Sequence, residues 1–548
     1  LTDAFSQIIY YFFSSNFFFD KLIWPKWEFL FLNSALIGLL HFSTTYNFIK
    51  VDNFYICVTA FSIFLLIKLY IEDDNYYIYW ILLSFWNSYS FFYYYKINNN
   101  HLYLIFTLVS ISISLIGYYQ FFSGHQFIVG IYDNPTGFSC SLVCLIPFVY
   151  KYWRDSKSLL PKYISGLAIL AVLAVLLLSE SRTAVISIFV IGFLLIPKKY
   201  KKGTFILNII LLIMLILFFK TNSSLGRIFI LIISFKMIKI DNILWGNGSG
   251  FFKNQYMTFQ SEYFKNIENE RYAQAADNIF HPMNEFLLFI IEHGIIFFIF
   301  LIILLILYLK KVNTKTPEFL SLISILVFSL FSYPFRYPII ILIVAYDLAS
   351  LSLKRSINIK YPSAIKLILV PFFSFWIIHI CYDSYNNYIW NEVNKKSKLG
   401  QFKKVQETYS ILYNYMDNNP YFLFNYSSTL FNQKDYKASL SYAIKTNNIL
   451  NNYDTQLLLA DNYKILKRYN ESLYHYTESS YMCPNRFIPL YGIYNIYKEI
   501  KDYKKMDSIG NIILTKEIKI KSPTIDNIID VVKKEKEVYN NIINDKYK

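Results

Sequence analysis

The stretch FLLFIIEHGIIFFIFLIILLILYL at residues 286–309 is an almost unbroken apolar run of the length that crosses a lipid bilayer as a helix. Similar runs recur as far as about residue 382. The predicted spans lie near residues 4–19, 27–43, 54–71, 76–95, 102–122, 137–152, 163–179, 183–197, 204–220, 286–309, 318–333, 337–353 and 365–382. Only 16% of the residues are charged, against about 25% in ordinary soluble domains. The sequence therefore predicts an all-α fold, a polytopic membrane bundle of about 12–13 transmembrane helices.

The basic character of the chain is explained by membrane topology. The formal net charge is +16, but Lys and Arg are retained in the cytoplasmic loops of membrane proteins. No basic patch with interleaved readout residues stands out, so we expect no nucleic-acid partner. The five cysteines form no CxxC pair, which argues against a zinc site or a disulfide framework. We expect no metal and no cofactor.

Basic loops also give the predicted orientation of the spans. The most basic loops are residues 151–162, 198–202, 310–315 and 354–360, and they alternate with weakly basic ones. Placing them in the cytoplasm puts the N-terminus there too, with the first apolar run as an uncleaved span. The turn at 179–182, the long loop 221–285 and everything after about residue 382 are then expected on the outer side.

Residues 383–548 differ from the membrane region at 1–382. They are rich in Lys, Asn, Asp and Tyr and have helical apolar spacing without a run of span length. Four stretches align, with an aromatic residue every 33 to 34 residues, at Phe402, Tyr436, Tyr469 and Tyr503. This is the period of tetratricopeptide (TPR) helix pairs. We predict a soluble TPR-like helical-repeat domain with degenerate repeats, whose curved surface binds a peptide or a protein partner.

Three ionisable residues at the ends of predicted spans are functional candidates, because a charge in lipid is costly unless it is paired or faces water. They are Arg182 in LLLSESRTAVIS, Arg227 in SSLGRIFILIISFKMIK and His281 in IFHPMNEFLLFIIEHG. Arginine binds phosphate through two parallel hydrogen bonds, and imidazole accepts a proton near neutral pH. The structural alternatives are a salt bridge between Arg182 and Glu180, an interfacial helix at Arg227 and a structural role for His281.

Five further residues are candidates for substrate binding: Asn134, Gly248, Arg271, Asn284 and Glu285. Asn284 and Glu285 equally suit the N-cap and first turn of a helix. Gly248 lies in GNGSGFF (246–252), where glycines permit a tight turn and close backbone approach. No strand is predicted before this motif, so we reject a dinucleotide site. His125 and Asp133 are expected to have structural roles in their loop and no catalytic role.

Four segments in this order resemble the O-antigen ligase family, which includes O-antigen polymerases and protein O-oligosaccharyltransferases. They are IYDNPTGFSCSLVCLIPF (131–148), LSESRTAV (178–185), LGRIFILIISFKMIKIDNILWGNGSGFF (225–252) and HPMNEFLLFIIEHG (281–294). The last is similar to the family pattern His-x-x-Asn-x-x-Leu followed by Glu-x-Gly. Met283 stands where the family often has His or another polar residue, and residues 253–280 have no clear match.

The resemblance implies a GT-C-type, metal-independent, inverting-type glycosyltransferase in the bacterial inner membrane. Such an enzyme takes a glycan from an undecaprenyl-diphosphate carrier and passes it to an acceptor hydroxyl on the periplasmic side. By analogy with the family, Arg182 and Arg227 hold the diphosphate and His281 activates the acceptor hydroxyl. Two cations suit this role because they stabilise charge developing on the leaving diphosphate. Arg271 is a reserve candidate for phosphate contact.

The acceptor is open at this stage. A periplasmic repeat domain slightly favours a protein Ser/Thr acceptor, and thus O-glycosylation, over the lipid A-core of lipopolysaccharide biosynthesis. A polymerase that extends the carrier-linked glycan is a third possibility in the same class. A transporter is expected to show paired charges within its spans or repeated membrane helices, and neither is evident. A scaffold without catalysis predicts that Arg182, Arg227 and His281 are dispensable.

Overall fold

The computed structural model describes residues 23–43, 48–51, 56, 59, 62–63, 77–95, 99–196, 221–266, 270–310, 312–351, 357–360 and 362–546. The predicted spans near 4–19 and 204–220, and most of that near 54–71, lie outside these residues. The chain divides into two compact units. The first comprises residues 1–219, 244–249 and 283–391, and the second comprises residues 220–243, 250–282 and 392–548. Helices dominate the described residues, so the predicted all-α class is confirmed.

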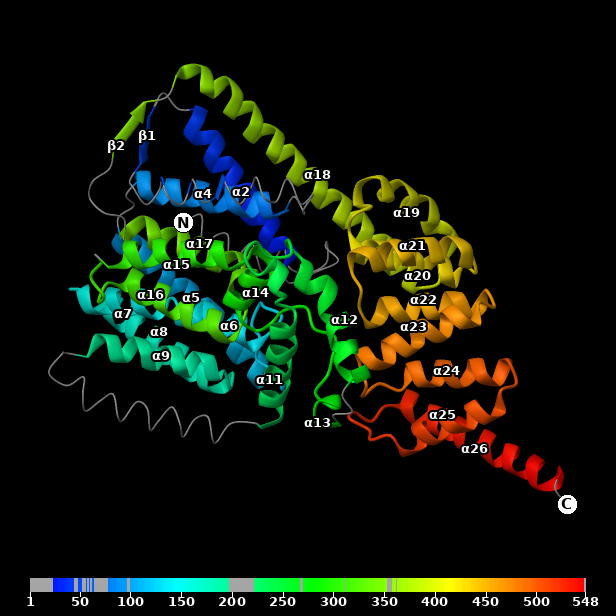
Figure 1. The fold of residues 1–548 in the computed structure, drawn as a ribbon. Helices are drawn as coiled ribbons and strands as arrows, with labels where there is room; N and C mark the ends of the chain where they lie inside the picture. Colours follow the sequence, from blue (N-terminus) through cyan, green and yellow to red (C-terminus); the bar gives the residue numbers. More distant parts are fainter. Residues whose placement is uncertain are drawn as a thin grey trace. The chain divides into compact units, whose positions relative to one another are not determined.

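The first unit is a bundle of apolar helices (Figure 1). Its helices are α2 (Trp24–Ser43), α4 (Tyr77–Tyr95), α5 (Asn99–Phe122), α6 (Pro135–Val143), α7 (Ile146–Asp155), α8 (Leu159–Leu178), α9 (Arg182–Leu195), α14 (Glu285–His293), α15 (Ile295–Leu309), α16 (Pro317–Phe331), α17 (Pro338–Leu351) and most of α18 (Lys366–Lys398), with the 3-10 turns η3 (Pro334–Arg336) and η4 (Ser363–Ile365). Three helical stretches in the described ranges, Asn100–Phe122, Leu159–Leu178 and Ser363–Lys398, are long and apolar enough to cross a membrane. The apolar helices α9, α15, α16 and α17 are shorter.

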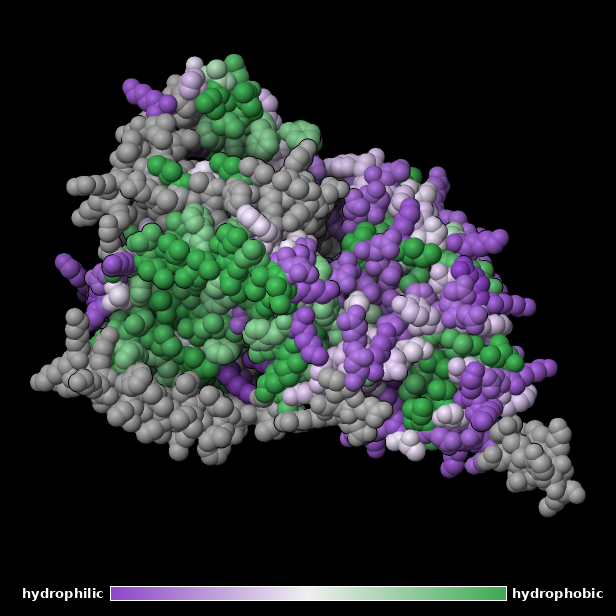
Figure 2. All heavy atoms as spheres, in the orientation of Figure 1, coloured by the Kyte–Doolittle hydropathy of each residue, from purple (hydrophilic) through white to green (hydrophobic). Residues whose placement is uncertain are grey.

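Large apolar side chains on the surface of this unit are explained by lipid. Leu167 and Leu177 on α8 are 66% and 73% exposed, and Ile306 on α15 is 59% exposed. Figure 2 shows hydrophobic residues covering much of the visible face of this unit. Exposed apolar surface of this extent is unfavourable in water but not against lipid chains. The chain is a membrane protein.

Two predicted spans are interrupted. The span near 137–152 is divided between α6 and α7, with Pro147 in the first turn of α7, where the absent N–H of proline is tolerated. The span at 286–309 is divided between α14 and α15 by Gly294, whose φ of 87° no helix allows.

One local feature departs from the helical pattern. Strands β1 (Phe48–Val51) and β2 (Ile357–Lys360) pair antiparallel, with Phe48 opposite Lys360 and Val51 opposite Ile357. The pair joins two segments that are distant in the sequence, which short-range patterns do not predict.

Helix α18 runs without a break through the predicted domain boundary at residues 382 and 383. Its residues from Glu392 onward belong to the second unit. There, the hydroxyls of Ser397 and Thr429 lie 2.8 Å apart, so the end of α18 packs on the first helices that follow it.

The second unit contains a row of antiparallel helix pairs (Figure 1). The helices are α19 (Phe402–Met416), α20 (Pro420–Asn432), α21 (Tyr436–Ile449), α22 (Tyr453–Ile465), α23 (Tyr469–Met482), α24 (Ile488–Glu499), α25 (Tyr503–Thr515) and α26 (Pro523–Lys546). The four recurring aromatic residues of the sequence are the first residues of α19, α21, α23 and α25. The turns that precede these four helices also repeat, with a left-handed residue at Gly400, Lys434, Lys467 and Lys501. Lysine occupies a glycine-favouring conformation three times, at some cost in stability.

The segment before α14 packs on these repeats. It contains α11 (Thr221–Lys236), the 3-10 turn η2 (Ile240–Asn242), α12 (Phe251–Asn266) and α13 (Glu270–Ala273). Phe229 of α11 is buried and stacks on Tyr272, with ring centroids 5.1 Å apart, and it also contacts Phe264 of α12. The Ser261 hydroxyl of α12 donates to the Glu478 carboxylate of α23 at 2.9 Å, and most of the long loop predicted at 221–285 belongs to the same compact unit as the repeats.

Candidate functional site

Arg182 begins helix α9 in the first unit. Ser181 is the N-cap of this helix, and its hydroxyl accepts the N–H of Ala184 at 3.4 Å. Glu180 has a φ of 52°, so the backbone takes a left-handed turn just before the cap. A half-buried guanidinium at the positive end of a helix favours an anion such as phosphate.

A polar cluster lies at the start of α6 and around η3. It comprises Asp133, Asn134, Tyr333, Arg336 and Tyr337, and is called the Asp133–Tyr337 cluster below. The Tyr337 hydroxyl donates to the Asp133 carboxylate at 2.6 Å and accepts from the Asn134 amide at 2.7 Å. The Asn134 amide also donates to the Tyr333 hydroxyl, and Arg336 pairs with Asp133 at 3.3 Å. Asn134, predicted to bind substrate, is thus the N-cap of α6 and a member of a bonded network.

Asn284 and Glu285 lie at the start of α14, in the same unit. The side-chain oxygen of Asn284 caps the N–H of Leu287 at 2.9 Å, and its amide donates to the Leu330 carbonyl at 3.1 Å. The Glu285 carboxylate accepts the N–H of Phe335 at 3.2 Å, next to Arg336. The start of α14 is therefore bonded directly to the η3 turn.

Met283, the departure from the family pattern, has a φ of 56°. A left-handed conformation at a residue with a side chain costs of order 1–3 kcal/mol and persists only where surrounding structure enforces it. Here the next residue, Asn284, is held by the two hydrogen bonds just described. Two of the candidate catalytic residues thus lie close in the sequence to a left-handed residue. Met283 follows His281 by two residues, and Glu180 precedes Arg182 by two.

Gly248 lies in a backbone contact within the first unit. Its N–H donates to the Glu292 carbonyl at 3.0 Å, and the N–H of Asn247 donates to the Ile291 carbonyl at 3.0 Å. Gly246, with a φ of 79°, lies so close to Glu292 and Gly294 that a Cβ would clash with backbone. The glycine motif thus satisfies carbonyls at the end of α14, and this packing accounts for it without a ligand.

Arg227, Arg271 and His281 belong to the second unit. Arg227 is half-buried on α11, two residues before the buried Phe229. Arg271 lies in α13, and His281 is half-buried just after the segment held by the repeats. Two of the three predicted catalytic residues therefore share a compact unit with the repeat domain.

Sequence reasoning did not single out Arg336, Tyr333 or Tyr337. They lie in SYPFRYP (332–338), the turn between two predicted spans. The rule that selected Arg182, a charge at the end of a span, also applies to Arg336. The aromatic partners carry no comparable signal, because their hydrogen bonds depend on tertiary structure.

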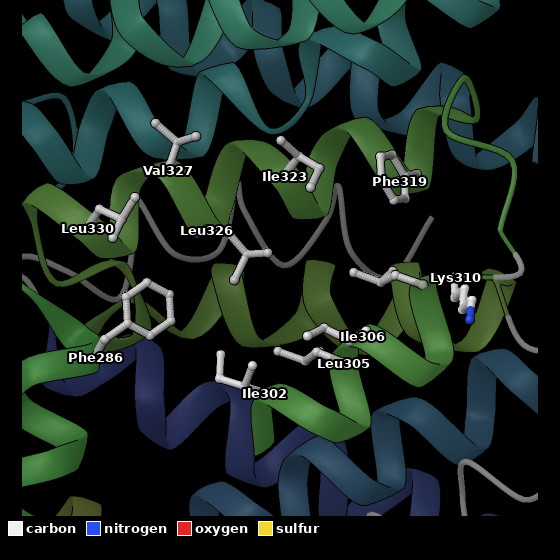
Figure 3. A pocket seen from close by; sticks show the side chains of 11 residues that line it. Phe286, Ile302, Leu305, Ile306, Lys310, Phe319, Ile323, Leu326, Val327 and Leu330 are labelled. Carbon is white, nitrogen blue, oxygen red and sulfur yellow. The ribbon is translucent and has the colours of Figure 1, made fainter. Parts of the chain in front are cut away.

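An apolar groove runs between α15 and α16 in the first unit (Figure 3). Its volume is about 590 Å³. The lining side chains in the described part of the chain are apolar apart from Lys310: Phe286, Ile302, Leu305, Ile306, Leu309, Phe319, Ile323, Leu326, Val327 and Leu330. Phe286, which follows Glu285 in α14, lines one end of the groove. Lys310, at the C-terminal end of α15, lines the other. Such a surface suits a hydrocarbon chain.

Residues 167–302 match the family described as O-Antigen ligase. The matched segment contains Arg182, Arg227 and His281, and it excludes the Asp133–Tyr337 cluster. No curated protein matches the chain. The family implies an enzyme of the glycosyltransferase type. This membrane protein therefore carries, at residues 167–302, the O-antigen ligase family domain that its motifs predict.

Proposed function

We propose that the protein transfers a glycan en bloc from undecaprenyl diphosphate to an acceptor hydroxyl at the periplasmic side of the bacterial inner membrane. The observation that carries this proposal is the family match, which contains all three predicted catalytic residues. The position of Arg182 at the positive end of α9 supports phosphate binding there.

The proposed reaction is a single displacement at the anomeric carbon of the first sugar. The acceptor oxygen forms a bond to this carbon as the bond to the diphosphate oxygen breaks, with inversion of configuration. His281 takes the proton of the acceptor hydroxyl, and undecaprenyl diphosphate leaves with the bonding electrons. Arg182 and Arg227 stabilise the charge that develops on this leaving group. We expect the reaction to need no metal, so activity persists in EDTA.

The apolar groove between α15 and α16 supports a lipid-linked donor. It provides a surface for part of an isoprenoid chain and passes the start of α14, where Glu285 lies. We propose that the groove contributes to donor affinity. Leu326→Trp, which fills it, is expected to raise the KM for the donor several-fold and to leave kcat unchanged.

Contacts within the first unit support the proposed topology. The indole N–H of Trp27 donates to the Arg336 carbonyl at 3.2 Å, and Phe335 bonds to Glu285. These four residues lie in loops predicted on the outer side or next to such a loop. Tyr103 and Glu318 both lie at the predicted cytoplasmic ends of their spans. The Tyr103 hydroxyl donates to the Glu318 carboxylate at 2.8 Å. We propose a cytoplasmic N-terminus and a periplasmic location for residues 383–548, which we regard as a degenerate TPR-like domain.

A transfer assay with purified, reconstituted protein and native lipid-linked glycan tests the function. Arg182→Ala, Arg227→Ala and His281→Ala are each expected to reduce transfer at least about a hundredfold. Arg154→Ala and His125→Ala, at exposed positions, serve as matched controls and should retain full activity. Full activity in all three site variants would refute the assignment and favour a scaffold.

The acceptor is tested in the same assay. We favour protein Ser/Thr slightly over lipid A-core because of the repeat domain, which offers surface for a protein partner. Periplasmic protein, lipid A-core and a second carrier-linked glycan are supplied in separate reactions. Transfer only to the carrier-linked glycan would identify a polymerase instead.

A further inference from the structure

The turns between the paired helices of the repeats form one edge that holds the chain just before His281. These turns follow α21, α23 and α25, and their contacts are with residues 251–278 of the same unit. We call them the docking edge and refer to the described residues 251–266 and 270–278 as the docked segment. Each of the three turns contributes a hydrogen bond or an ion pair.

The turn after α21 and the first turn of α22 contact the two ends of the docked segment. The backbone N–H of Asn451 donates to the side-chain oxygen of Asn254 at 3.1 Å. The side-chain amide of Asn451 donates to the Thr258 hydroxyl at 2.9 Å. Close by in the sequence, the Asp454 carboxylate accepts from Asn278 at 3.2 Å.

The turn after α23 makes the most protected contacts. The Asn485 amide donates to the Ala276 carbonyl at 2.6 Å, and Asn485 is only 8% exposed. Gln260 of α12 is fully buried, and its amide donates to the carbonyls of Asp277, at 3.1 Å, and Met482. Arg486 pairs with the Asp277 carboxylate at 2.7 Å in a more exposed position. The turn after α25 adds a bond from Gln274 to Glu517 at 3.2 Å.

The contacts follow the repeat pattern. Asn451 and Asn485 lie in successive turns of the docking edge, 15 and 16 residues after the first residues of α21 and α23, and both donate side-chain amide hydrogens to the docked segment. Asn418, in the corresponding turn after α19, is exposed. Two successive turns of the docking edge therefore each supply a side-chain amide donor.

The docked segment ends very near His281. Only two residues separate Asn278 from His281, so the three intervening backbone steps span at most about 10 Å. A buried amide that fixes residues 276 and 277 therefore restricts where the imidazole can lie. Misplacement of a catalytic group by about 1 Å can cost about a hundredfold in rate.

We propose that the repeat domain binds its own loop through the docking edge, and that Gln260 and Asn485 are positioning residues for His281. This inference rests on the proposed transferase function. The binding partner of the repeats is then a segment of the same chain, and the rate of transfer depends on the contacts of the docking edge.

The test uses the full-length reconstituted protein with Asn485→Asp, which preserves shape but sets a carboxylate against the Ala276 carbonyl. Asn418→Asp, at the equivalent exposed turn, is the matched control. We expect Asn485→Asp to lower kcat ten- to a hundredfold with the donor KM within about twofold of wild type. The control should match wild type in both constants. Equal kcat in Asn485→Asp and wild type would overturn the proposal.

Hydrogen exchange in two regions distinguishes a positioning role from general destabilisation of the repeats. It also distinguishes failure of the docking proposal from failure of the proposed transferase function. Amide hydrogen exchange should speed up at residues 274–282 in Asn485→Asp, while α19 and α20 remain as protected as in wild type. Unchanged exchange at 274–282 refutes the positioning role even if wild-type protein shows no transfer. Faster exchange there without wild-type transfer supports the docking and leaves only the proposed function refuted. Gln260→Met is expected to behave as Asn485→Asp does.

Discussion

Replacement of Gly294 by alanine should destabilise the first unit much more than the same change at another left-handed glycine. Gly294 separates α14 from α15 with a φ of 87° and a ψ of 167°, a region essentially reserved for glycine. That conformation alone costs an alanine about 1–3 kcal/mol. A Cβ would also lie 2.6 Å from the carbonyl carbon of Leu244, and backbone cannot move away cheaply. This overpacking adds about 1–3 kcal/mol, for a total of roughly 2–6 kcal/mol.

Gly250 is the matched control for this change. Its φ is 79°, but no atom lies within 4 Å of an added Cβ. Gly250→Ala should cost only the backbone term, about 1 kcal/mol. Thermal unfolding of both variants in one detergent, followed by tryptophan fluorescence, should show a clearly larger loss for Gly294→Ala. The ring of Trp245 lies 6.3 Å from that of Phe297 and reports on this contact. Equal midpoints for the two variants would refute the close packing of the glycine motif on the end of α14.

Three further perturbations test other parts of the structure. Tyr337→Phe removes a hydroxyl bonded to two partners and should cost about 1–3 kcal/mol in thermal unfolding, whereas Tyr119→Phe, at a 68% exposed site, should be neutral. An equal effect of the two changes would contradict the Asp133–Tyr337 cluster. Burial lowers the pKa of His475 to about 4, so only the unfolded chain binds this proton as the pH falls below about 6.5. Stability of the repeat domain should therefore fall between pH 6.5 and 4, and His475→Gln should reduce that slope; an unchanged slope would exclude His475 as its source. Lys467→Gly, at a φ of 60°, should raise the unfolding free energy by up to about 1 kcal/mol, and a loss instead would argue against the left-handed turn.

The parts of the fold that depend on local pattern could be predicted from the sequence. Apolar runs mark the helices of the first unit because a segment in lipid needs apolar side chains and must satisfy its backbone hydrogen bonds internally, as a helix does. The aromatic residues at Phe402, Tyr436, Tyr469 and Tyr503 mark the repeat period because each begins a helix. The interruptions of two spans were not predicted, since composition alone does not reveal that the Gly294 backbone packs against Leu244.

The arrangement of the site was predictable only in part. The N-cap roles of Asn134 and Asn284 follow from local chemistry. The bond between Glu285 and Phe335 joins turns 50 residues apart, and that between Asn134 and Tyr337 spans 203 residues. Pairings at such separations leave no periodic signal. The docking edge was missed for the same reason, because Asn485 and Ala276 are 209 residues apart.

The central claim is en bloc transfer from a lipid diphosphate, and the most direct measurement is the mass balance of one reaction. Reconstituted wild-type protein receives lipid-linked glycan and acceptor, and both products are analysed by intact mass. We predict that each acceptor gains one whole glycan while one undecaprenyl diphosphate is released, and that His281→Ala yields neither product. Unchanged product formation by His281→Ala would contradict the role of this residue. An intact donor with every acceptor, or a donor that grows longer on its carrier, would contradict transfer to an acceptor.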